Sequence, residues 1–272
     1  MTHASTWINP TEAKAAIERG TGRGIKIAVI DSGIELSHPS LRHVRLIDDV
    51  AFEENEQGLA RRVAGGGVDA YGHGTAIASV ILRAAPEVEL GSFRVLDSKL
   101  GSKCEIIQEA ALLAIERGYH ILNCSFGSPA NLEKIKYFKS WIDYAYTQGV
   151  HVVSACNNSY FRDPEWPGFF PSVITVNMAR TLDDGVFLRW DVSEVGKVVH
   201  LVEFAARGVE LQLPWKNHRV AQHTGSSYAA PHVAGLLARL LSIHPRIKPL
   251  VAKCLLQEVA EPWTVDIRGP NS

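Results

Sequence analysis

Short apolar runs alternate along this chain with longer segments whose apolar residues recur at helical spacing. The runs predict strands over Ile25–Ile30, Glu89–Leu96, Tyr119–Cys124, Val150–Ala155 and Ser172–Val176. Helices are predicted within 1–20, over 71–82, 104–117 and 131–147, and from Ser227 to about Ile243. Residues 53–70 are polar and predict a surface loop. Over residues 179–223 the apolar pattern is shorter and more β-like, and a polar tail is expected to close the chain.

Strands that alternate with helices are typical of a parallel sheet with right-handed crossovers. The run from Ile25 to Ile30 is almost continuously apolar, as in a strand buried on both faces. We find no internal repeat, low-complexity segment or linker. The sequence therefore predicts one α/β domain over residues 21–272, with residues 1–20 as an N-terminal extension.

The composition excludes several classes of protein. The 272 residues carry a formal net charge of −1 and are 46% hydrophobic, so nothing favours nucleic acid or an anionic membrane as a partner. No apolar run approaches the roughly 18 residues of a membrane span. The N-terminus lacks the pattern of a secretory signal. The four cysteines form no C-x-x-C pair, which favours free thiols and a cytoplasmic location over disulfides or zinc.

Three residues at element ends carry the candidate chemistry. Asp31 follows the first strand, His73 opens an apolar helix between two glycines, and Ser227 opens another helix after a glycine. Taken singly, they could be a turn cap, a core histidine and a helix N-cap. Together they supply an orienting carboxylate, a general base and a nucleophile, which are the three roles of acyl transfer to a hydroxyl.

A fourth candidate is Asn158, which ends another predicted strand. Its side-chain amide could donate a hydrogen bond to the oxyanion that forms during acyl transfer. Its neighbour Asn157 keeps a claim to the same role.

These motifs resemble those of the subtilisin-like serine proteases, in the same order along the chain. The aspartate motif is Val29–Ile34 followed by His38-Pro39, and the histidine motif is Gly72–Thr75. The serine motif, usually Gly-Thr-Ser-Met-Ala-Ala-Pro-His-Val-Ala-Gly, is Gly225–Gly235, with Tyr228 in place of the methionine. The resemblance extends from about residue 20 to 245.

The resemblance implies a three-layer subtilisin-like fold with a mainly parallel central sheet flanked by helices. It also implies a serine endopeptidase that uses Asp31, His73 and Ser227, with Asn158 in the oxyanion hole. Ser125, Phe126 and Gly127 would form the edge along which an extended peptide substrate pairs.

The sequence also departs from the family. Secreted relatives bind calcium through an aspartate after the His-Pro pair and through a loop inserted after the histidine helix. Here the first position is Ser40, and there is almost no insertion after the helix. We therefore expect no metal there and no cofactor. Glu165 falls where the family often has a small residue at the base of the substrate pocket, which favours Lys or Arg before the scissile bond unless Glu165 points to solvent.

Two other functions remain open at this stage. One is a catalytically latent relative that binds a peptide or protein in the same cleft, since Tyr228 and Asn157 depart from the motif. The other is an esterase, although the chain lacks the G-x-S-x-G elbow of the α/β-hydrolases. A protease in the cytoplasm must be restrained, so we expect narrow specificity or control by a regulatory protein or fused domain.

Overall fold

A mainly parallel sheet divides the molecule. The computed structural model describes residues 8–160, 163–180, 187–190 and 202–263. The strands of the main sheet are β1 (Lys26–Asp31), β2 (Asp48–Glu54), β3 (Ala60–Ala64), β4 (Glu89–Arg94), β5 (Ile121–Cys124), β7 (His151–Ala155), β9 (Ile174–Ala179), β10 (Phe187–Trp190), β11 (Phe204–Arg207) and β14 (Glu261–Trp263). Their order is β14-β10-β11-β9-β7-β5-β1-β4-β2-β3, and only the pairs β2–β3 and β10–β11 are antiparallel.

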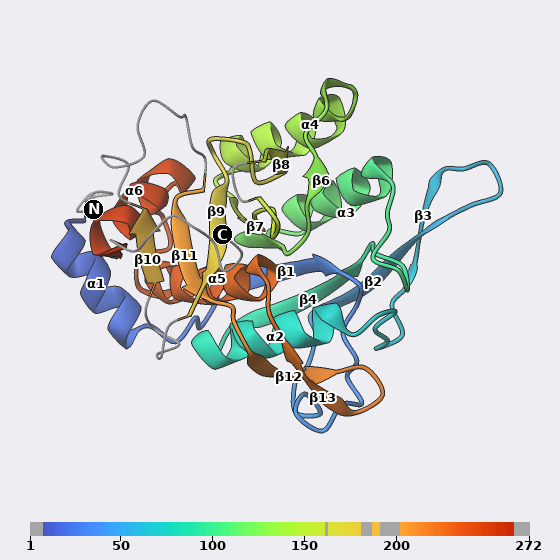
Figure 1. Ribbon diagram of the computed structural model, residues 1–272, viewed down its shortest axis with the longest axis horizontal. Coiled ribbons are helices and arrows are strands. Elements are labelled where there is room, and N and C mark those ends of the chain that lie inside the picture. The colour runs from blue at the N-terminus through green and yellow to red at the C-terminus, as the bar shows by residue number, and fades with distance from the viewer. Residues whose placement is uncertain (1–7, 161–162, 181–186, 191–201, 264–272) are drawn as a thin grey trace, which may run out of the picture.

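Helices cover both faces of this sheet (Figure 1). They are α1 (Pro10–Arg19), α2 (His73–Ala84), α3 (Cys104–Glu116), α4 (Leu132–Gln148), α5 (Ser226–Ile243) and α6 (Pro249–Val259). Buried residues of α3 and α4 form the core on one face, and those of α1, α2, α5 and α6 form the core on the other. The structure thus has the three-layer α/β architecture that the sequence predicted.

Helix α5 lies at the centre of the second layer because its sequence is apolar on almost every side. Most of its residues are buried, and it packs closely on α2. A side chain on Gly235 would come within 2.5 Å of the Ala84 methyl group, so this crossing requires glycine. The two helices that begin with Ser226 and His73 are therefore locked to one another.

Two expectations for the ends of the sheet were wrong. Residues 53–70 are not simply a loop, because β2 and β3 form a hairpin that extends from the body of the protein (Figure 1). Charged residues at exposed positions of its strands, such as Arg61 and Arg62, made this segment look like a loop. The chain also does not close on a simple polar tail, because α6 buries Ala252, Leu255 and Leu256 and is followed by β14.

The segment expected to be an extension is partly in the core. Helix α1 buries Ala13, Ala16 and Ile17 against α5 and α6. Asn9 and Glu12 form a capping box at its start, each side chain accepting a hydrogen bond from the other's backbone N–H. Residues 10–19 therefore belong to the same packed unit as the domain.

A separate hairpin precedes α5. Strands β12 (Leu211–Trp215) and β13 (Arg219–His223) pair with each other, and Asn217 and His218 turn the chain with φ of 62° and 57°. The Glu35 carboxylate accepts hydrogen bonds from both turn N–H groups, at 3.2 and 3.4 Å. This contact ties the hairpin to the loop that follows β1.

One buried histidine makes stability depend on pH. His151 is 2% exposed, and burial lowers the pKa of its imidazole to about 4. The unfolded chain binds this proton near pH 6.5, so the free energy of unfolding decreases as the pH falls from 6.5 towards 4. We expect His151→Gln to remove this contribution, about 1–2 kcal/mol between pH 7 and pH 5. Urea unfolding at both pH values measures it.

The exposed His43 provides the matched control, as His43→Gln. The comparison uses the difference between the two pH values, so a uniform loss of stability in a variant does not affect it. Equal pH dependence in the parent and His151→Gln would contradict the prediction.

Candidate active site

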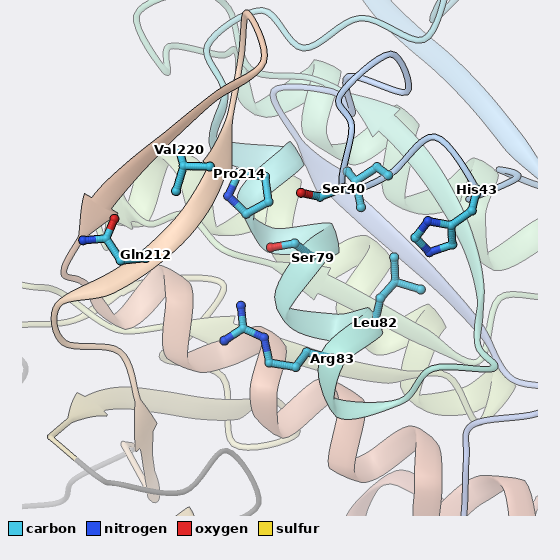
Figure 2. Close-up of a pocket in the computed structure, with 9 residues that line it drawn as sticks. Ser40, His43, Ser79, Leu82, Arg83, Gln212, Pro214 and Val220 are labelled. Carbon is cyan, nitrogen blue, oxygen red and sulfur yellow. The ribbon is translucent and has the colours of Figure 1, made fainter.

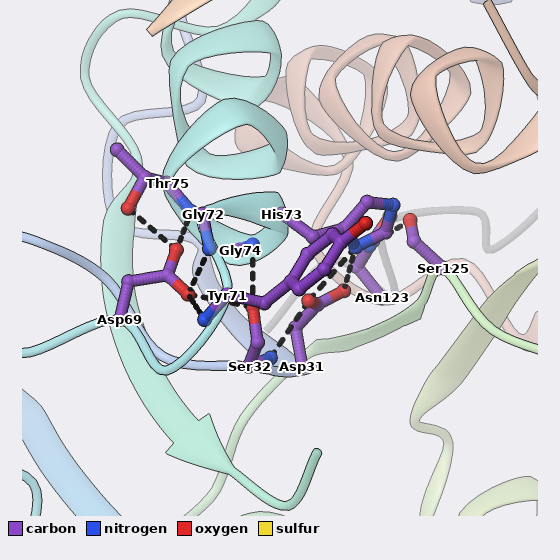
Figure 3. Close-up of polar contacts among 10 residues, drawn as sticks. All are labelled: Asp31, Ser32, Asp69, Tyr71, Gly72, His73, Gly74, Thr75, Asn123 and Ser125. Carbon is purple, nitrogen blue, oxygen red and sulfur yellow. Dashed lines mark hydrogen bonds and ion pairs between the residues drawn. The ribbon is translucent and has the colours of Figure 1, made fainter. Parts of the chain in front are cut away.

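Asp31 and His73 form a buried pair at the carboxyl end of β1. Asp31 is 0% exposed and His73 is 5% exposed. His73 Nδ1 donates to the Asp31 carboxylate, at 2.9 Å from Oδ1 and 3.0 Å from Oδ2 (Figure 3). The backbone N–H of Ser32 also donates to Oδ1 at 2.7 Å. The carboxylate thus fixes the orientation and the tautomer of the imidazole and leaves Nε2 as the reactive nitrogen.

The glycines on either side of His73 have a packing role. A side chain on Gly74 would lie 2.1 Å from the carbonyl oxygen of Gly33, just after the end of β1. Gly72 has φ of 120°, and a side chain there would meet the indole of Trp215 at 2.6 Å. The start of α2 can approach β1 and the hairpin closely enough to place His73 only because both residues lack a side chain.

Charges around His73 raise the pKa of its imidazole above the ordinary value. Burial by itself would lower the pKa, but the charge of Asp31, the hydrogen bond to it and the charge of Asp69 outweigh that effect. The imidazolium form, which must exist briefly in acyl transfer, is stabilised as a result.

Asp69 holds the N-terminus of α2 in place (Figure 3). Its carboxylate accepts hydrogen bonds from the Ser32 hydroxyl, from the backbone of Tyr71, Gly72 and Thr75, and from the Thr75 hydroxyl, all at 2.6–2.9 Å. The Ser32 hydroxyl in turn accepts from the Gly74 N–H at 3.1 Å. The N–H groups that a helix leaves unpaired at its start are therefore satisfied here, next to His73.

Ser227 and Asn158 meet at the start of α5. The backbone N–H of Ser226 donates to Asn158 Oδ1 at 2.8 Å. This bond assigns the oxygen of the Asn158 amide to the side of Ser226 and the nitrogen, Nδ2, to the opposite side of the amide. A side chain on Gly225 would lie 3.3 Å from Ser227 Oγ and 3.6 Å from Asn158 Oδ1. The hydroxyl and the amide therefore border the same small space.

The link from His73 to Ser227 is less direct. Within the described parts of the chain, the hydrogen bonds of His73 go to Asp31 and not to Ser227. The ring of the next residue, Tyr228, lies 5.2 Å from the His73 ring, so the helix start faces the imidazole. Hydrogen bonds between a nucleophilic side chain and its general base are often long before the substrate binds.

Asn157 and Glu165 lie next to this space. Asn157 Oδ1 accepts from the N–H groups of Ser159 and Tyr160 at 2.8 Å, and its Nδ2 donates to Glu165 at 3.0 Å. Both ends of the Asn157 amide are thus engaged, unlike those of Asn158. Of the two candidates, Asn158 is the one whose Nδ2 donates no hydrogen bond to the described residues.

Glu165 is half-buried and does not point freely into solvent. A side chain on Gly127 would come within 2.1 Å of its Oε2, so the carboxylate lies against Gly127. Burial raises the pKa of Glu165, and the hydrogen bond from Asn157 opposes this only in part. The group sits where a cation would stabilise its charged form.

The edge expected to pair with a peptide lies directly after β5. Ser125, Phe126 and Gly127 follow β5 without belonging to a strand. Ser125 is 4% exposed, and its hydroxyl accepts from Asn123 Nδ2 at 2.9 Å. Phe126 packs against the core beneath. The short strand β6 (Ser128–Pro129), which pairs with β8 (Glu165–Trp166), extends this edge past Gly127.

The sequence of this chain is similar to those of known proteins. The model of the subtilase family, peptidase S8, matches residues 22–267. The chain belongs to the subtilase family. It is 31% identical over 259 residues to M-protease of Shouchella clausii and 30% identical over 252 residues to subtilisin NAT of Bacillus subtilis subsp. natto. These alignments cover 90% and 88% of this chain, but only 62% and 61% of the relatives.

Solved structures agree with this assignment. Sphericase superposes with a TM-score of 0.73 at 27% identity, and the alignment covers 94% of this chain and 93% of that one. A cold-adapted subtilisin-like serine proteinase gives a TM-score of 0.67 at 22% identity, covering 88% and 83% of the two chains. At that identity the second match supports the fold alone.

Ser40 occupies the position at which we expected a calcium ligand to be missing. Ser40 lines an open pocket of about 380 Å³ between α2 and the β12–β13 hairpin (Figure 2). The other residues that line it are Leu41, His43, Ser79, Leu82, Arg83, Gln212, Pro214 and Val220, which include no carboxylate. Helix α2 continues past this point without an insertion. Calcium prefers carboxylate and carbonyl oxygens, so this lining does not suit it.

The four thiols are free, and two of them lie near the active site. Cys124 and Cys156 are buried, and burial raises the pKa of both thiols. Among the described residues, no group of three or more metal-binding side chains is placed to hold an ion. No described helix is both long and apolar enough to cross a membrane.

The sequence pattern did not predict the role of Asp69. One signal was available. The N-cap of α2 is Gly72, which has no side chain to cap the helix, and Asp69 lies four residues before His73. The aromatic residues around His73, such as Trp215 and Tyr71, gave no signal, since their proximity depends on the hairpin fold.

A titration tests the electrostatic environment of His73. We expect its imidazole to titrate above pH 6.5, because Asp31 and Asp69 stabilise the cation. Asp69→Asn removes one negative charge and should lower the midpoint by about one unit or less. Nuclear magnetic resonance of the imidazole in a Ser227→Ala background measures this without self-digestion.

The control is Asp143→Asn, an exposed residue on α4 across the sheet. It should leave the His73 midpoint unchanged. A midpoint that moves upward in Asp69→Asn, or equally in both variants, would contradict the assigned cause.

Proposed function

We propose that this protein is a serine endopeptidase. The observation that carries the proposal is the buried hydrogen bond between Asp31 and His73 beside a helix that begins Ser226-Ser227, in a chain of the subtilase family. Its substrates are peptides or proteins, and the chemistry requires no cofactor. The three side chains come from β1, α2 and α5, which the core locks together.

The proposed reaction follows from the placement of these groups. Ser227 Oγ attacks the carbonyl carbon of the peptide bond while its proton moves to His73 Nε2. Asn158 Nδ2 and the backbone N–H of Ser227 at the start of α5 donate hydrogen bonds to the resulting oxyanion. His73 then gives the proton to the leaving nitrogen as the C–N bond breaks. Water cleaves the acyl-enzyme by the same steps in reverse order and leaves a carboxylic acid.

A fluorophosphonate probe tests the nucleophile. We expect labelling of Ser227 in the purified protein, because an activated serine beside oxyanion donors reacts with this reagent. Ser227→Ala should abolish labelling, and peptide hydrolysis should fall by on the order of a millionfold. Mass spectrometry of the labelled peptide locates the modified residue.

The control is Ser226→Ala, which removes the neighbouring hydroxyl that donates to the Cys156 carbonyl at 2.6 Å. It should retain labelling at Ser227. A folded parent protein that is not labelled would contradict the proposal and favour the alternative, a catalytically latent domain that binds a peptide or protein.

We further propose that the pocket before the scissile bond prefers Lys or Arg. The half-buried Glu165 carboxylate supports this, because a substrate cation would form a charge-assisted hydrogen bond with it against Gly127. Such a bond contributes about 1.5–3 kcal/mol, or roughly 10–100-fold in kcat/KM. We expect Arg-containing substrates to be cleaved faster than Leu-containing substrates by this factor.

Glu165→Gln should remove most of this preference while its side-chain oxygen still accepts from Asn157. Asp163→Asn is the control for a nearby exposed charge. Equal cleavage of Arg and Leu substrates by the parent protein would contradict the preference.

We also propose that the protein works in the cytoplasm. Four free thiols, two of them buried near the active site, support a reducing compartment such as the cytoplasm. A protease in that compartment needs narrow specificity, as Glu165 would provide, or control by a regulatory protein or fused domain.

A further inference from the structure

One lysine lies in the core, on the buried face of α6. Lys253 is 5% exposed, and the other buried residues of this helix are Pro249, Ala252, Leu255 and Leu256. Moving an ammonium group out of water costs a great deal of free energy unless its protons find partners. The packing of α6 therefore does not by itself explain why a lysine stands at this position.

The three protons of this ammonium group have three acceptors. Lys253 Nζ donates to the carbonyl oxygens of Pro171 and Val173, each at 2.7 Å, and forms an ion pair with the Glu203 carboxylate. The other oxygen of Glu203 accepts from the Thr175 N–H at 3.4 Å. Burial raises the pKa of Glu203, and the charge of Lys253 opposes this rise. The ammonium group thus lies in a cage of oxygen atoms from segments far from α6 in the sequence.

Both carbonyl groups belong to residues 167–173, which connect β8 to β9 without a helix or strand of their own. Within this connection, the Phe169 N–H donates to the Glu165 carbonyl at 2.8 Å. Backbone groups outside helices and strands need other partners when they are buried. Lys253 supplies such partners near the end of the connection, and the start of the connection is bonded to Glu165.

The remaining contacts of Glu165 are short-range. Strands β6 and β8 pair over two residues each, and Asn157 Nδ2 donates to the Glu165 carboxylate at 3.0 Å. The connection after β8 is therefore a main determinant of where Glu165 lies. We propose that Lys253 is a positioning residue of the substrate pocket, whose ammonium group fixes this connection and so holds Glu165 where a substrate cation would meet it.

This inference rests on the proposed function and on the preference that we assign to Glu165. The partners of Lys253 separate its effect on position from its effect on stability. Removing the ammonium group alone leaves the Glu203 carboxylate buried without a counter-ion, which destabilises the fold. Removing both charges avoids that cost, but the carbonyl groups of Pro171 and Val173 still lose their donor.

The experiment measures the hydrolysis of two peptides that differ only in Arg or Leu before the scissile bond. In Lys253→Met the donors are lost, and the Arg-to-Leu ratio of kcat/KM should fall by roughly tenfold or more, because a small displacement of a binding group is costly. The loss should appear mainly as a higher KM for the Arg peptide, since the Glu165 contact contributes to binding.

Two further variants complete the comparison. Lys253→Met combined with Glu203→Gln should be more stable to urea than Lys253→Met alone and should show the same low ratio. Lys248→Met is the matched control, because Lys248 is an exposed lysine at the N-cap of the same helix. It should keep the ratio of the parent protein.

Fluorophosphonate labelling counts the active sites in each sample. A variant that is merely less folded loses labelled sites, but its KM and its ratio stay those of the parent protein. That result in the double variant would overturn the inference and leave Lys253 with a role in stability alone. A parent ratio near one would overturn it together with the preference assigned to Glu165, while labelling of Ser227 in that sample would support the proposed protease function. If the parent protein is not labelled and cleaves neither peptide, both proposals fail.

Discussion

The active site depends on one buried interaction, the hydrogen bond between the Asp31 carboxylate and the His73 imidazole. Removing such groups from water is costly unless each remains paired, so the surrounding structure must hold them together. The close approach of Gly74 to the Gly33 carbonyl brings the start of α2 to the end of β1. A side chain at that contact would separate the pair and leave a buried charge without compensation.

The same constraint continues outward from His73 through a chain of satisfied polar groups. Asp69 pairs with the start of α2 and with the Thr75 hydroxyl. That hydroxyl accepts from the backbone of Glu35 at 2.9 Å, and the Glu35 carboxylate holds the turn of the β12–β13 hairpin. The general base His73 and the hairpin beside it are therefore positioned by one network of hydrogen bonds rather than by separate loops.

Local pattern predicted the parallel strands, the main helices and the ends that carry Asp31, His73 and Ser227, because apolar periodicity and glycine motifs are properties of short segments. It failed for the β2–β3 hairpin, whose charged exposed strands look like a loop, and for α6, whose apolar face is short. It also missed Asp69. The role of Asp69 depends on contacts between segments far apart in sequence, which no single segment reveals.

The polar groups around the cleft divide into two kinds. Asp69 receives five hydrogen bonds and is fully satisfied, as expected for a residue that holds the framework. Glu165 has a raised pKa, and Nε2 of His223 is buried without a partner among the described residues. Incomplete satisfaction costs stability in the free protein. For the half-buried Glu165 carboxylate, a bound peptide with a cationic side chain would supply the missing partner.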